Sequence, residues 1–202
     1  MATHSATSLF DTNMESANDC VALYDAIAKL KPANVNLDWI LRAGVVFAVS
    51  ALDTYFHDKV RYRVGKYSLD NLPPALAKFQ IPIGELTSWD SATRKGNVLR
   101  NWVVEDLSTR PLQSRRAIQD AMKLAGIDAL WDTIEPHQKK REALLKELDM
   151  LIRRRNQISH EGDRMTSRRS GKRLRSITRD EVTAWIKVAT DLVARIEKVF
   201  PY

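Results

Sequence analysis

The segment RRRNQISHEGD, residues 153–163, contains the side chains of this sequence that are best able to carry out chemistry. Arg155 precedes His160 by five positions. An arginine stays positively charged and can bind a phosphate through two parallel N–H bonds, while a histidine can both give and accept a proton near neutral pH. The pair therefore has the properties needed to cleave a phosphodiester without a metal ion. Because such a pair is common by chance, the surrounding sequence must distinguish a functional role from a structural one.

The excess positive charge of the chain is concentrated around this segment. Residues 153–179 contain ten Lys or Arg and two acids, a net charge of +8, so the remainder carries −1 (+7 minus +8). This asymmetry favours a polyanionic partner more than a uniformly basic surface would. The alternative is a solvated, flexible loop without a partner.

Composition argues against several other classes of function. Cys20 is the single cysteine, which excludes an internal disulfide and a cysteine-based zinc site and suits a reducing cytosol. The four histidines are scattered and Gly-rich phosphate loops are absent, so we expect no metal, no cofactor and no NTPase activity. The N-terminus lacks the pattern of a signal peptide, and the longest apolar stretch, around residues 43–52, is too short to span a bilayer. We therefore expect a cytoplasmic protein without membrane contact.

The apolar pattern predicts an all-α fold in one domain spanning residues 1–202. No segment shows the sustained two-residue alternation of a strand. We expect a bundle of four to five main helices, a short irregular connection around residues 65–91, a frayed start over residues 1–12 and a basic loop over residues 163–177. The segments with helical patterning are approximately 13–30, 37–64, 97–107, 112–124, 128–134, 136–162 and 179–200.

Helix geometry separates the three consecutive arginines. At about 100° per residue, Arg155 lies in the middle of the apolar arc of its helix, Arg153 points to solvent, and Arg154 lies on the flank. Arg155 is therefore expected to face the bundle or an interface. Since an unpaired buried guanidinium is costly, Arg155 either pairs with an acid such as Asp53 or binds a ligand at the mouth of a cleft, and the sequence leaves both open.

The position of His160 on the helix limits how it can meet Arg155. In an unbroken helix His160 lies about 140° around the axis from Arg155. The two side chains therefore converge only if the helix opens before Gly162 or if a second copy of the chain completes the site.

The segment from Arg155 to His160 matches the R-x(4–6)-H motif of HEPN domains, including the polar residue directly after the arginine. In order and spacing, LRAGVVFAVSALDTYFHDKV, the segment around Trp131 and RRNQISHEGD resemble the RiboL-PSP-type HEPN family, from about Asn36 to the C-terminus. This resemblance implies an all-α HEPN fold. It also implies a metal-independent endoribonuclease of toxin–antitoxin, phage-defence or RNA-processing systems. Such proteins usually pair as homodimers, so that two copies of the motif line one cleft.

Carried over to this chain, the resemblance gives the catalytic positions to Arg155 and His160, with Asn156 as the supporting polar residue. Residues with a possible supporting role are Asp53, His57, Glu161 and Asp163. The basic side chains expected to contact the RNA backbone are Arg154, Arg164, Arg168, Arg169, Lys172, Arg173 and Arg175. An antitoxin protein is a further partner that the family suggests.

The residue types support one mechanism. RNA carries its own nucleophile, the ribose 2′-OH, so a base and an acid from two copies of His160 suffice, with Arg155 stabilising the charge on the phosphorane. The products would be a 2′,3′-cyclic phosphate and a 5′-OH end, and DNA would resist cleavage. Two alternatives remain open. One is a non-catalytic RNA- or nucleotide-binding HEPN module; the other is a purely structural helical protein in which Arg155 pairs with an acid and His160 caps the helix.

Overall fold

The computed structural model describes residues 6–81, 83–93, 95–165 and 173–202, and these ranges contain helices and no strand. The expected all-α fold is confirmed. The longer helices are α1 (Ala6–Lys29), α2 (Asp38–Val64), α5 (Lys95–Ser108), α6 (Arg115–Leu124), α8 (Gln138–Glu161) and α9 (Arg179–Val199). The connections contain the shorter helices α3 (Pro74–Ala77), α4 (Leu86–Ser91) and α7 (Leu130–Ile134) and the 3-10 turns η1 (Leu69–Asn71) and η2 (Ile83–Glu85).

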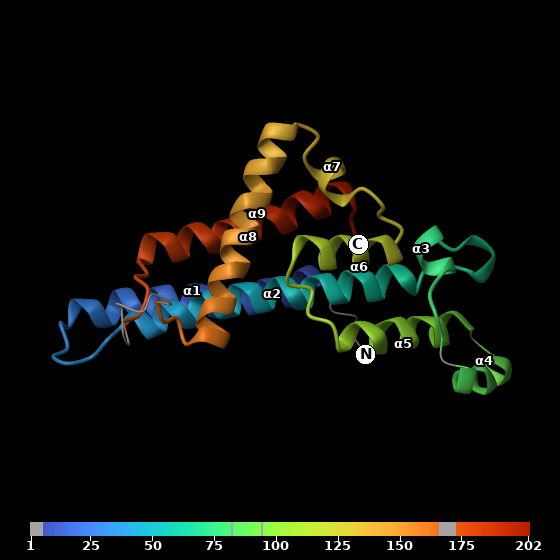
Figure 1. Cartoon of the computed structure of the whole chain (residues 1–202), viewed down its shortest axis with the longest axis horizontal. Coiled ribbons are helices and arrows are strands. Elements are labelled where there is room, and N and C mark those ends of the chain that lie inside the picture. Colours follow the sequence, from blue (N-terminus) through green and yellow to red (C-terminus); the bar gives the residue numbers. More distant parts are fainter. Residues whose placement is uncertain (1–5, 82, 94, 166–172) are drawn as a thin grey trace.

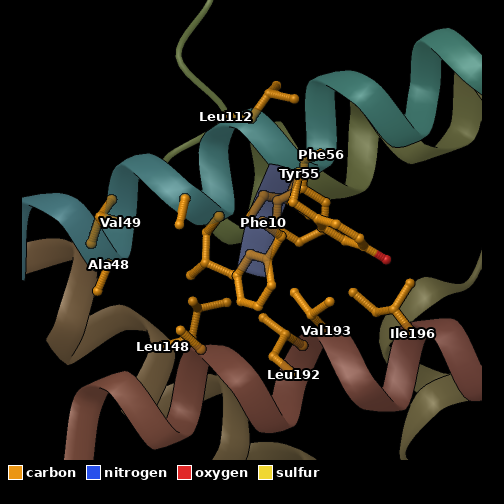
Figure 2. Packing of buried hydrophobic residues seen from close by; sticks show 14 of the residues in the cluster. Phe10, Ala48, Val49, Tyr55, Phe56, Leu112, Leu148, Leu192, Val193 and Ile196 are labelled. Atoms are coloured by element: carbon orange, nitrogen blue, oxygen red, sulfur yellow. The ribbon is translucent and has the colours of Figure 1, made fainter. Parts of the chain in front are cut away.

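Helix α2 is the centre of the fold and packs against α1, α5, α6, α8 and α9 (Figure 1). By length and composition alone, α2 could cross a membrane, but just over half of its most apolar window is buried inside the protein. Figure 2 shows how its side chains meet those of the neighbouring helices. The buried residues in this contact include Ala48, Val49, Tyr55 and Phe56 of α2, Phe10 of α1, Leu148 of α8, and Leu192, Val193 and Ile196 of α9. This packing is typical of the core helix of a soluble protein.

Helix α1 begins earlier than the sequence predicts. A frayed segment was expected up to residue 12, but the helix starts at Ala6, and Phe10 and Met14 are buried in the core. Burial of each such side chain contributes about 1.5–3 kcal/mol, which is enough to hold an additional helical turn. The part of the predicted frayed segment before Ala6 lies outside the described residues.

Helix α8 carries the motif and crosses α2 and α9 at a steep angle (Figure 1). Its buried side chains include Leu148 and Leu151, which contribute to the common core. The C-terminal end of α8 projects beyond α2 in this view. The motif is therefore placed at the edge of the bundle, where its residues are partly open to solvent.

Candidate functional site

The end of α8 has a regular geometry. The helix continues without a break through His160 to Glu161, and Gly162 ends it in the left-handed conformation, with φ of 59°. An opening before Gly162, the first of the two routes by which Arg155 and His160 could converge, is therefore not present. In an unbroken helix the two side chains lie about 140° apart around the axis. Within one chain they point to different sides of α8.

Arg155 is half-buried at this end of the helix. Its Nη1 donates a hydrogen bond of 3.2 Å to Oδ1 of Asn156, while its buried Nε has no partner among the described residues. The pairing with Asp53 that the sequence left open is not formed, since Oδ1 of Asp53 accepts a bond of 2.6 Å from the backbone N of Leu112. A buried donor without an acceptor costs about 1–3 kcal/mol. The guanidinium of Arg155 is thus held next to Asn156 through Nη1, while Nε and Nη2 have no acceptor among the described residues.

His160 is exposed and its ring has no hydrogen-bond partner among the residues that the structure describes. By helix geometry it lies within about 40° of Arg153 and Asn156 and about 60° of Gln157. Arg153 is also exposed, as the sequence predicts. His160 therefore shares its side of α8 with Arg153, Asn156 and Gln157, and not with Arg155.

A surface groove of about 640 Å³ runs along this side of α8. Its lining comprises Asp149, Ile152, Arg153, Asn156, Gln157 and Glu161 of α8, together with Gln113, Ser114 and Arg175. Of the three predicted catalytic residues, the groove includes Asn156. Gln113, Ser114 and Gln157 could not be identified from the sequence, because a groove formed where three separate segments meet leaves no pattern in any one of them.

The expected position of Arg154 is wrong. Arg154 is buried, with 7% of its surface exposed, and its Nη1 and Nη2 bind the two carboxylate oxygens of Asp163 at 2.6 and 2.9 Å. Burial lowers the pKa of Arg154; the charge of Asp163 opposes this shift, and the neighbouring Arg42 adds to it. An arginine nevertheless keeps its charge inside a protein. Because its guanidinium is committed to Asp163, Arg154 cannot serve as the RNA contact expected from the sequence.

Asp163 lies at the centre of a buried ion cluster with Arg42 and Arg154. Its side chain is fully buried, and Oδ2 also accepts a bond of 2.6 Å from Nε of Arg42 on α2. Its backbone N donates to the carbonyl of Gln157 on α8, and its carbonyl accepts from the N of Arg175. Asp163 therefore supports the site structurally, by fixing the end of α8 to α2 and to the chain that returns from the basic loop.

The described ends of the basic loop lie side by side. Arg164 forms an isolated antiparallel bridge with Leu174, and the N of Met165 donates to the carbonyl of Arg173 at 2.9 Å. Arg164 and Arg173 are exposed, whereas the half-buried Arg175 pairs with Glu161 at 3.1 Å. Arg168, Arg169 and Lys172, the other basic residues expected to contact RNA, lie outside the described residues.

Asp53 and His57 hold a backbone connection and do not contact the motif. The two ring nitrogens of His57 lie 2.8 and 3.0 Å from the carbonyl oxygens of Asp53 and Leu107. Together with the bond from Leu112 to Asp53, these contacts attach the chain between α5 and α6 to α2. The sequence could not indicate this role, because the backbone groups of Leu107 and Leu112 lie 50 residues after His57 and 59 residues after Asp53, respectively. Their connection to the groove is indirect, through the segment that leads to Gln113.

The same end of α8 contains no group of three or more His, Cys, Asp or Glu side chains that could hold a metal ion, nor does any other part of the chain that the structure describes. No curated protein and no solved structure matches the chain. The family model of RiboL-PSP-HEPN matches residues 12–201. This match covers nearly the whole chain, and the motif and the helical fold agree with it. The chain therefore belongs to the RiboL-PSP-HEPN family.

Proposed function

We propose that the chain is a metal-independent endoribonuclease that acts as a homodimer, in which His160 and Arg155 come from different protomers. The observation that supports this proposal best is the regular end of α8, which holds His160 and Arg155 on different sides of one helix. Each of the two has free hydrogen-bonding capacity in the described structure. A second copy of the chain is the simplest source of the missing half of the site.

His160 would provide the proton transfers. The ring of one His160 takes the proton of the ribose 2′-OH and then gives this proton to the leaving 5′-oxygen. The 2′-oxygen then forms a bond to phosphorus while the bond to the 5′-oxygen breaks, which leaves a 2′,3′-cyclic phosphate and a 5′-OH end. The exposure of His160 allows its ring to reach a substrate.

Arg155 would stabilise the negative charge that develops on the phosphorane. Its bond to Oδ1 of Asn156 fixes one end of the guanidinium, which gives Asn156 a positioning role. A charged donor held in place before the reaction stabilises the transition state without reorganisation. The exposed arginines Arg164 and Arg173 at the base of the basic loop would attract the RNA backbone.

The proposed setting is the cytoplasm, where an RNase of this family would act in defence, in a toxin–antitoxin pair or in RNA processing. The test is incubation of the purified protein with total RNA and transfer RNA in EDTA, followed by analysis of the new ends. Wild type should produce 5′-OH ends and leave DNA intact. His160→Ala should cleave about 100-fold more slowly or worse, the contribution typical of general acid–base catalysis.

His137→Ala provides the matched control, because His137 is an exposed histidine at the other end of the same helix. Its cleavage rate should equal that of wild type. Equal rates for wild type and His160→Ala would overturn the catalytic role of His160. Binding of RNA without new 5′-OH ends would favour the second candidate, a non-catalytic RNA-binding module, which the separation of Arg155 and His160 within one chain also permits.

A further inference from the structure

Among the residues that the structure describes, one cation that lines the groove beside α8 has no ion-pair partner. Four charged side chains line it: Asp149, Arg153, Glu161 and Arg175. Asp149 pairs with Arg115 at 2.5 Å, and Glu161 pairs with Arg175 at 3.1 Å. Arg153 is exposed and forms no ion pair with any residue that the structure describes. The charge left for a ligand is therefore the single positive charge of Arg153, which selects for an anion.

The position of Arg153 relates the groove to the candidate catalytic residue. His160 lies seven residues further along the unbroken helix. This separation corresponds to about 20° around the axis and about 10 Å along it. A chain that binds in the groove along α8 therefore passes from Arg153 towards His160. An anion at Arg153 that belongs to the same polymer as the reacting group would be a neighbouring phosphate.

The remaining polar lining consists mainly of amides. Gln113 and Gln157 are half-buried, and their side chains make no hydrogen bond within the described structure. An amide side chain offers both an acceptor oxygen and donor N–H groups, and can therefore pair with the edge of a nucleobase. Sequence-specific recognition of RNA commonly involves such contacts to unpaired bases. A volume of about 640 Å³ also falls in the range typical of sites for small ligands.

We propose that this groove is a nucleotide-binding subsite next to the cleavage site, in which Arg153 binds an RNA phosphate and Gln113 and Gln157 contact the base. The proposal rests on the proposed function, because it takes RNA as the ligand. Arg153 thereby acts as a substrate-binding residue outside the motif pair, and the two glutamines determine base preference.

The test of Arg153 is a salt titration of RNA binding. A labelled single-stranded RNA is titrated with the His160→Ala protein, so that the substrate is not consumed, and with the same protein carrying Arg153→Gln. Loss of one phosphate contact should lower the affinity and reduce the slope of log K against log salt by about 0.7. Arg116→Gln serves as the matched control, since Arg116 is a 93% exposed arginine outside the groove. This variant should leave the slope unchanged.

The test of the glutamines compares affinities for single-stranded oligomers of U, C and A. Gln157→Leu and Gln113→Leu should change the ratios between these affinities while the salt slope stays constant. Unchanged ratios would overturn base recognition, and an unchanged slope for Arg153→Gln would overturn the phosphate site. Cleavage by the protein with native His160 is measured separately. RNA binding that depends on Arg153 without any cleavage would support the subsite and contradict the nuclease. Cleavage whose rate is the same with and without Arg153 would support the nuclease and contradict the subsite.

Discussion

Arg154 and Asp163 are joined by two parallel hydrogen bonds, Nη1 to Oδ1 at 2.6 Å and Nη2 to Oδ2 at 2.9 Å, in a buried environment. Arg42 of α2 adds a third bond to the same carboxylate. One carboxylate thus serves two buried guanidinium groups. The cluster links α2, the end of α8 and the base of the basic loop, so it determines where the motif residues lie.

The first prediction concerns the stability that this cluster provides. We expect Asp163→Asn to lower the free energy of unfolding by about 3–5 kcal/mol, because it leaves the buried Arg154 without its counter-charge and Arg42 with only the 3.7 Å contact to Asp38. Urea denaturation gives the value. As a control, Asp191→Asn removes an exposed ion pair between Lys187 and Asp191 within α9 and should cost about 0.5 kcal/mol or less. Equal losses for the two variants would contradict a structural role for Asp163.

The second prediction contrasts two neighbouring arginines. Arg154→Gln should lower stability by about 1.5–3 kcal/mol, less than Asp163→Asn, because the carboxylate keeps Arg42 as a partner. For Arg154→Gln, the slope of log K against log salt for RNA binding should equal that of the protein with native Arg154, since Arg154 is not available to a ligand. Arg153→Gln should behave in the opposite way, with nearly unchanged stability and a smaller slope. Denaturation and RNA titration of both variants test this contrast, and a reduced slope for Arg154→Gln would contradict it.

The all-α fold could be predicted from the sequence because helical periodicity of apolar residues directly reflects burial on one face. The same periodicity placed Arg153 in solvent correctly. It failed for Arg154, because the partner that allows its burial, Asp163, lies beyond the end of the helix and is not part of the helical pattern. Arg155 was expected to face the bundle or an interface, and it is half-buried near the C-terminal end of α8.

The third prediction concerns the dependence of stability on pH. The hydrogen bond from Arg195, 2.5 Å long, lowers the pKa of Glu135 from its ordinary value of 4.5. A carboxyl whose pKa is lower in the folded state stabilises the fold above its unfolded pKa and loses this contribution as the pH falls through the folded pKa. The difference in melting temperature between wild type and Glu135→Gln should therefore be largest above pH 4.5 and shrink in more acidic solution.

Glu142→Gln is the control for this experiment, since Glu142 is exposed and accepts a hydrogen bond from the neutral Gln138. Its melting temperature should follow that of wild type at each pH. A Glu135→Gln difference that stays constant from neutral to acidic pH would show that the bond to Arg195 does not stabilise the charged carboxylate.

The last prediction tests how the active pair is assembled. Because α8 is regular through His160, we propose that each site combines His160 of one protomer with Arg155 of its partner. Arg155→Ala and His160→Ala should each be inactive alone. When the two variants are mixed and allowed to exchange subunits, a heterodimer contains one protomer with an intact His160 and one with an intact Arg155. Cleavage of RNA should then reappear, at a fraction of the wild-type rate, because such a heterodimer can form a hybrid site.

Absence of cleavage after proven subunit exchange would show that the two residues must belong to the same chain. Exchange is followed independently by labelling the two variants with different fluorophores and measuring energy transfer between them. A mixture of Arg155→Ala with the double variant Arg155→Ala/His160→Ala is the matched control, since it contains no intact Arg155 and should remain inactive. Activity in the first mixture but not in the second would therefore locate the site between protomers, because neither chain of the active heterodimer has both residues.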